Sequence, residues 1–123
     1  MNRDTDLFVQ AFWVKCRETI RPELDQMVGE LNESGHQAHV STQEYSEVPD
    51  GLPDPGPSLI LTVHASGAPQ ANTLSFRGDV PRRDVEVARS GEASRRYELA
   101  ALDASVAKRE IADWVANLLS LRP

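Results

Sequence analysis

The chain has 123 residues, of which 40% are hydrophobic and 26% are charged, and its formal net charge is −6. This composition excludes a wholly disordered chain, and the length holds one hydrophobic core, so we expect a single domain over residues 1–123. No run of about 18 apolar residues is present, which excludes a membrane-spanning helix and a membrane partner. Residues 1–6 are polar and lack the features of a signal peptide, so we expect a cytoplasmic protein.

The acidic charge is concentrated in the first half of the chain. Residues 1–57 carry 11 acids and 4 bases, a net charge of −7. Residues 58–102 carry 6 bases and 5 acids, and every one of these bases is an arginine. Because an acidic chain repels nucleic acid at long range, a nucleic-acid partner requires a local arginine patch in this middle section.

Apolar residues recur at spacings of three and four over residues 9–31, which predicts one long amphipathic helix. The predicted buried stripe is Val9, Trp13, Cys16, Ile20, Leu24, Met27 and Leu31. Pro22 interrupts the helix without changing the phase of this stripe, so we expect one helix that is kinked at Pro22. At the usual rise per residue its length is roughly 40 Å, which exceeds what a core of this size needs.

The start of this helix is rich in aromatic side chains, namely Phe8, Phe12 and Trp13. Aromatic residues are enriched at the centres of protein interfaces. We therefore predict that these three residues form an interface, either with a second copy in a homodimer or small homo-oligomer, or with another protein partner.

Five short segments alternate between apolar and polar residues, which is typical of strands with one buried face. They are residues 36–45, 59–65, 72–77, 84–89 and 95–99. Turn-forming residues separate most of them, so an antiparallel meander is the simplest arrangement. A second helix follows, with an apolar stripe at Ala107, Ile111, Trp114, Leu118 and Leu121. The predicted fold class is α+β: a long N-terminal helix, about five antiparallel strands and a C-terminal helix.

Residues 47–57 hold four of the eight prolines of the chain. This density of proline excludes a helix or a central strand there, because proline lacks the backbone N–H that both structures use. We expect a stiff, extended and exposed loop between two strands.

The three histidines give little support to catalysis or to metal binding. His36 and His39 fall on opposite faces of a strand, whereas a zinc site normally shows three or four clearly spaced ligands, so we expect no metal and no cofactor. Cys16 lies on the helix stripe, where it is expected to act as a small apolar residue. A small enzyme that uses His64 with a nearby acid is retained as a third hypothesis, because catalytic residues can be gathered from distant strands.

Arginines alternate with acids along the later strands. Arg77, Arg82, Arg83, Arg95 and Arg96 lie among Asp84, Glu86 and Glu98. Cross-strand ion pairs on a solvated sheet face account for this pattern. Alternatively, the same arginines are placed to contact the phosphates of RNA.

Residues 74–80 read Leu-Ser-Phe-Arg-Gly-Asp-Val. This segment resembles the second motif of Sm and Sm-like RNA-binding proteins, in which an apolar strand end is followed by Arg-Gly and a return to apolar residues. The resemblance implies a strongly bent, five-stranded sheet and an oligomer joined through edge strands. It also implies an RNA base pocket to which Arg77 and Gly78 contribute.

Two leading hypotheses follow for the function. The first is an interaction module that self-associates and has no catalytic activity. The alternative is an Sm-like RNA-binding protein, with RNA contacts from Arg77, Gly78, Arg82, Arg83, Arg95 and Arg96.

Overall fold

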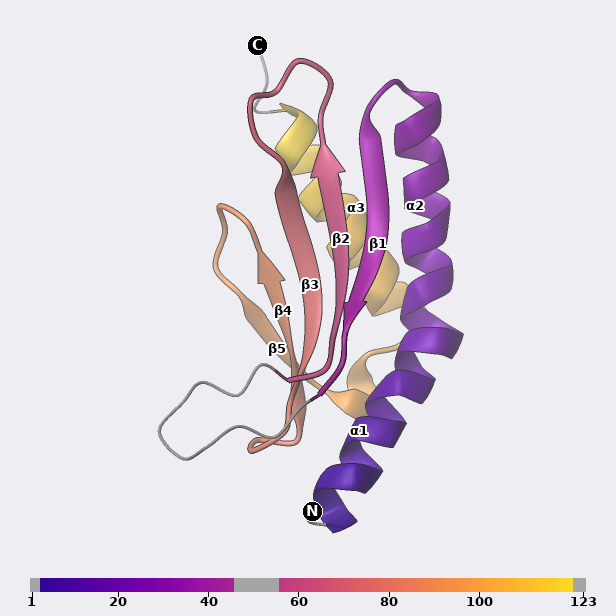
Figure 1. The fold of residues 1–123 in the computed structure, drawn as a ribbon, viewed down its shortest axis with the longest axis vertical. Helices are drawn as coiled ribbons and strands as arrows, with labels where there is room; N and C mark the ends of the chain where they lie inside the picture. The colour runs from indigo at the N-terminus through magenta and orange to yellow at the C-terminus, as the bar shows by residue number, and fades with distance from the viewer. Residues whose placement is uncertain (1–2, 46–55, 121–123) are drawn as a thin grey trace.

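The computed structural model describes residues 3–45 and 56–120 (Figure 1). A long helical segment comes first and comprises α1 (Arg3–Lys15), a π-helix (Cys16–Ile20) and α2 (Arg21–Glu33). Five strands follow: β1 (Gln37–Gln43), β2 (Ser58–His64), β3 (Asn72–Asp79), β4 (Asp84–Arg89) and β5 (Arg95–Glu98). The 3-10 helix η2 (Leu99–Ala101) then leads into α3 (Ala104–Ser120). The predicted α+β fold is thereby confirmed.

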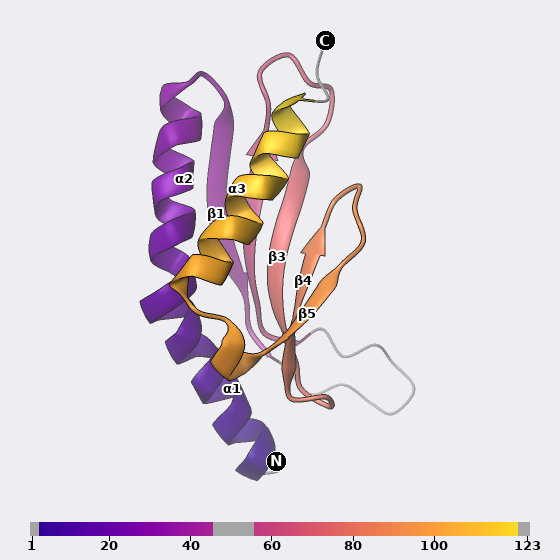
Figure 2. The ribbon, with the colours of Figure 1, turned by 180° about the vertical axis from the view of Figure 1, so that it is seen from behind.

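The five strands form one antiparallel meander in the order β1-β2-β3-β4-β5. The sheet is neither closed nor strongly curled, so the strongly bent sheet implied by the Sm-like resemblance is wrong. The physical reason is visible in Figures 1 and 2: α2 and α3 lie against the sheet on one side. Because helices cover the apolar face, the sheet does not have to curl around it to bury it.

The period-two pattern of the strands places their apolar residues on the helix-covered face. Fully or almost fully buried strand residues on this face are Leu59, Leu61, Val63, Leu74, Phe76, Val85 and Val87. The helices contribute Phe12, Ile20, Leu24, Ile111 and Trp114 to the same core. The opposite face of the sheet is largely polar, and no helix of residues 3–45 or 56–120 covers it (Figure 1).

The interruption of the first helix lies at Cys16–Ile20 and not at Pro22. Here the Arg21 N–H donates to the carbonyl of Cys16, five residues back, as in a π-helix. Pro22 itself lies in the first turn of α2, directly after the π-helix, where it has no N–H to donate to the preceding turn.

The π-helix also corrects the predicted phase of α1. The buried residues are Phe8, Phe12, Cys16, Ile20 and Leu24, at a constant spacing of four, whereas Val9 and Trp13 are only partly buried. Because an α-helix has 3.6 residues per turn, residues that are spaced four apart move gradually around the helix axis and away from the core. The extra residue of the π-helix restores the alignment, so that both halves of the segment face the same core.

The first strand, β1, lies at an edge of the sheet. Asn32 at the end of α2 pairs with its backbone: the Ala38 N–H donates to Asn32 Oδ1 at 3.0 Å, and Asn32 Nδ2 donates to the Ala38 carbonyl at 3.3 Å. A side-chain amide therefore substitutes for a neighbouring strand at this position.

Most of the predicted proline-rich loop, residues 47–55, lies outside the described residues. Gly56 and Pro57 are described and buried, and the Pro57 carbonyl accepts a hydrogen bond from the Gly78 N–H at 2.8 Å. Within the described parts of the chain, no helix has both the length and the apolar character that crossing a membrane requires.

Candidate interaction surface

The aromatic residues predicted to form an interface belong largely to the core of their own chain. Phe12 is fully buried and Phe8 is 8% exposed. Trp13 is half-buried, contacts the Phe12 ring edge-to-face at a centroid distance of 5.2 Å, and lines a small cavity of about 160 Å³ with Thr42 and Leu59. Phe12 therefore offers no surface to a partner, because it packs against the sheet.

The exposed large apolar side chains of α1 are different ones. Leu7 is 52% exposed and Val14 is 41% exposed. Ala11 lies between them and is also exposed. Spacings of four and three place the three residues on one side of the helix, away from Phe8 and Phe12. We call Leu7, Ala11 and Val14 the α1 seam.

The α1 seam borders a groove of about 550 Å³. The helical wall of the groove comprises Ala11, Val14, Lys15, Glu18 and Thr19, and the other wall comprises Leu99 and Ala100 of η2. Figures 1 and 2 both show η2 beside the C-terminal part of α1. Ala11 and Val14 of the seam therefore share the groove with two apolar residues from a distant part of the chain, Leu99 and Ala100.

Charges of opposite sign lie at the two ends of the seam. Asp4 and Asp6 are in the first turn of α1, and Lys15 is in its last turn. Arg17 follows within the π-helix, and its guanidinium lies 3.7 Å from Glu18, with both side chains largely exposed. An exposed ion pair of this kind contributes little by itself.

Asp79 is the centre of an ion-pair network on the open face of the sheet. Its carboxylate lies 3.0 Å from Arg96, 3.6 Å from Arg77 and 4.0 Å from Arg82. Burial alone would raise the pKa of Asp79, but hydrogen bonds from the Arg82 backbone N–H and the Arg96 guanidinium lower this pKa below its ordinary value. Three of the arginines considered for RNA binding thus share a charged carboxylate within the chain.

The two other candidate arginines also have partners in the chain. Arg95 lies 2.8 Å from the buried carboxylate of Glu110. Arg83 donates to the Val80 carbonyl at 2.8 Å, and its guanidinium lies 6.0 Å from the centroid of the Phe8 ring. The structure therefore distributes the five arginines among structural contacts, and does not gather them at one cavity.

Gly78 faces the core and not the open face of the sheet that carries Arg77. A Cβ atom at Gly78 would lie 3.0 Å from Cγ of Pro57 and 3.2 Å from the Phe12 ring. The glycine thus allows α1 to approach β3 closely. This packing accounts for Gly78 without a base pocket.

The remaining chemistry-bearing residues have local roles in the fold. His64 Nε2 donates to the Ala68 carbonyl at 2.7 Å, and His36 Nδ1 accepts from the Ser66 N–H at 2.9 Å. Both histidines therefore hold the turn between β2 and β3. Burial raises the pKa of the Cys16 thiol to about 12, which keeps it protonated and unreactive at neutral pH.

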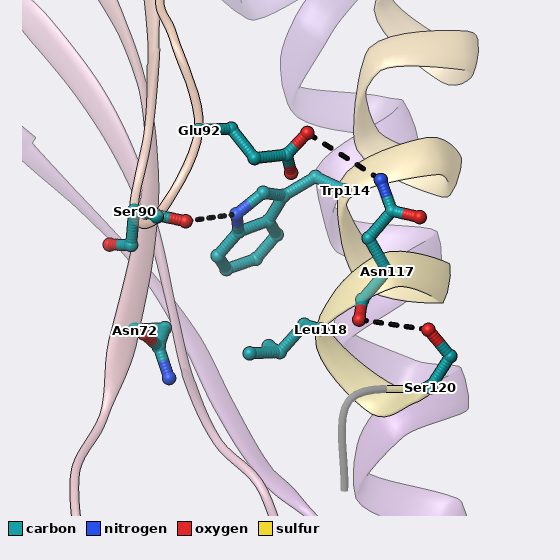
Figure 3. Close-up of a pocket in the computed structure, with 8 residues that line it drawn as sticks. Asn72, Ser90, Glu92, Trp114, Asn117, Leu118 and Ser120 are labelled. Atoms are coloured by element: carbon teal, nitrogen blue, oxygen red, sulfur yellow. Dashed lines mark hydrogen bonds between the residues drawn. The ribbon is translucent and has the colours of Figure 1, made fainter.

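A second concavity, a cleft of about 330 Å³, lies between the sheet and the second half of α3 (Figure 3). Trp114 and Leu118 project from α3, and the Trp114 indole N–H donates to the Ser90 carbonyl at 3.5 Å. Asn117 Nδ2 donates to the Glu92 carboxylate at 3.5 Å. These bonds tie the turn between β4 and β5 to α3, which is a structural role for the polar groups of the cleft.

The seam was not identified from the sequence, although a signal for it was present. Leu7 and Val14 are seven residues apart with Ala11 between them, which is a second apolar stripe beside the buried one. Assigning Val9 and Trp13 to the core obscured this stripe.

Comparison with protein-family models, with curated proteins and with solved structures finds no match to this chain. No relative therefore assigns a family or a role to its residues, including residues 74–80. The arrangement of its own side chains is what bears on its function.

Proposed function

We propose that this protein is an interaction module that self-associates through α1 and has no catalytic activity. The observation that carries the proposal is the α1 seam, in which two large apolar side chains remain exposed on one side of a helix whose other side is buried. Single exposed apolar residues are common on protein surfaces. Here two of them, Leu7 and Val14, are aligned, and Val14 also lines an apolar groove. Aligned apolar surface of this kind marks interaction sites.

The seam also explains why the first helix is long. Its buried residues continue along α2, and α1 adds a further exposed apolar stripe to them. Full burial of a Leu or Val side chain contributes about 1.5–3 kcal/mol, and only about half of Leu7 and of Val14 is still exposed, so association can add about half of this for each. In a symmetric dimer each residue is buried twice, so Leu7 and Val14 together provide a substantial driving force for association.

The test is a pair of charge insertions in the seam. Leu7→Asp and Val14→Asp should each weaken self-association by at least roughly 100-fold, because each places two carboxylates in the apolar contact. Sedimentation equilibrium over a dilution series measures the change. Ala116→Asp is the matched control, since Ala116 is exposed on α3 and lies away from both the seam and the groove. Equal association of all four proteins would reject the seam as the contact.

The alternative function, RNA binding, is opposed by the contacts of the arginines. Phosphates would have to compete with the carboxylate of Asp79 for Arg77, Arg82 and Arg96. We expect no rise in fluorescence anisotropy when the protein is added at low salt to a labelled U-rich oligonucleotide. A rise that Arg77→Ala abolishes would instead support the Sm-like alternative.

A further inference from the structure

The charged residues around the α1 seam determine which way a partner helix fits. Asp4 and Lys15 are eleven residues apart, which is close to three turns of an α-helix, so both flank the seam on the same side. One is near the start of α1 and the other is near its end. Together with Arg3 and Asp6 at the start, and with Arg17 and Glu18 at the end, they leave a net charge of −1 at one end of the seam and +1 at the other.

Two copies of α1 bring opposite charges together only when the helices run in opposite directions. In an antiparallel pair of α1 helices, Asp4 of each copy approaches Lys15 of the other copy, and the two ion pairs are related by the two-fold axis. In a parallel pair, acids would lie beside acids and lysines beside lysines. Glu18, one turn beyond Val14, does not cancel the preference, because Arg17 lies 3.7 Å from its carboxylate.

The groove beside the seam can accommodate a helix of the second copy. Its far wall is formed by Leu99 and Ala100 of η2, so an incoming helix would contact both α1 and η2. An amphipathic helix that lays its apolar side into such a groove is a common mode of recognition.

We propose that the occupant of this groove is α1 of a second copy, packed antiparallel, with Leu7, Ala11 and Val14 of the two chains in contact. This arrangement rests on the proposed function and specifies its partner and its geometry. The contact is isologous, so it closes at two chains and does not propagate into a fibre. A helix of 13 residues provides an interface at the small end of the specific range, so the dimer should dissociate on dilution.

The orientation is tested by charge reversal. Asp4→Lys and Lys15→Asp should each raise the dissociation constant roughly tenfold, because each replaces two attractive pairs by two repulsive ones. The double variant D4K/K15D restores opposite charges across an antiparallel contact and should return to within about twofold of the native constant. Sedimentation equilibrium at low salt gives the four constants, and circular dichroism confirms that each variant is folded.

The outcomes separate the orientation from the function. A parallel contact would leave all three variants near the native constant, which overturns the antiparallel arrangement and leaves self-association standing. A double variant that is as weak as the single ones also overturns it. A native chain that is monomeric at every concentration overturns both proposals.

The participation of η2 is tested separately at Ala100. Ala100→Asp places a charge in the far wall of the groove and should weaken the dimer, whereas Ala101→Asp changes an exposed neighbour that does not line the groove. Equal dissociation constants for these two variants would show that the second helix does not enter the groove.

Discussion

At the scale of the residue, Gly78 fixes the distance between α1 and the sheet. In Gly78→Ala the new methyl group would lie 3.0 Å from Pro57 and 3.2 Å from the Phe12 ring, so one of them must move. We expect a loss of about 1–3 kcal/mol in the free energy of unfolding, measured by urea denaturation. Gly29→Ala is the control: its Cβ meets no atom within 4 Å, and it should stabilise α2 by about 0.5–1 kcal/mol. A fully stable Gly78→Ala variant would contradict this account of Gly78.

Asp79 should make stability depend on pH in the acid range. Its folded pKa is lowered by its partners, so its contribution is complete above the ordinary carboxyl pKa of about 4 and is lost as the pH falls through the folded value. Asp79→Asn should cost about 1–2 kcal/mol at pH 7. The difference from the native protein should shrink progressively as the pH falls below about 4, and it should vanish below the lowered folded pKa of Asp79, where both proteins lack the charge.

The control for this measurement is Asp113→Asn, since Asp113 is exposed on α3. It should leave the free energy of unfolding nearly unchanged at either pH. An Asp79→Asn variant whose deficit is the same at pH 3 and pH 7 would show that the deficit does not come from the charge of this carboxylate.

At the scale of the element, a buried carboxylate links β5 to α3. Glu110 is fully buried, and its Oε1 accepts from the Tyr97 hydroxyl at 2.6 Å and from Arg95 at 2.8 Å. Tyr97→Phe removes one of these donors and should cost about 1–2 kcal/mol. A double-mutant cycle with Glu110→Leu should be non-additive, because both changes remove the same hydrogen bond. Additive costs would show that Tyr97 and Glu110 contribute independently.

The strands could be predicted from the sequence, and the phase of the first helix could not. Alternation of residues such as Leu59, Leu61 and Val63 depends only on the period of a strand, and the sheet keeps that period. Pro22 signals an interruption of the first helix, but it does not indicate the π-helix at Cys16–Ile20, whose extra residue keeps the core aligned on both sides. In α1 the predicted buried stripe is therefore off by one residue: it contains Val9 and Trp13, whereas the structure buries Phe8 and Phe12.

The candidate site was harder to predict for the same reason. The prediction that Phe8, Phe12 and Trp13 form an interface rests on the length of the helix, yet Phe12 packs in the core because Gly78 has no side chain in its way. Leu7 and Val14 can be recognised as exposed only when the buried side of α1 is known. The cross-strand ion pairs, by contrast, follow from the alternation of acids and arginines: Arg77 pairs with Glu86, and Arg96 pairs with Asp84 and Glu86, as that pattern predicts. Asp79 was not among the predicted acids.

At the scale of the whole molecule, the two faces of the sheet differ in what covers them. One face is buried under α2 and α3, and the other carries a network of acids and arginines that satisfies its own charges (Figures 1 and 2). Neither leaves a large apolar surface for a partner. The exposed apolar surface of the described chain lies instead on α1 and beside η2, which is why we propose that self-association occurs there.

The mass of the native protein in solution tests this assignment most directly. Size exclusion with multi-angle light scattering, run over a range of loading concentrations beside Leu7→Asp, compares the two proteins under one condition. The account predicts a native mass that approaches twice the chain mass of 13.6 kDa as concentration rises, and a variant that stays at the chain mass. A native protein that stays at the chain mass throughout, or a variant that associates as the native protein does, would contradict it.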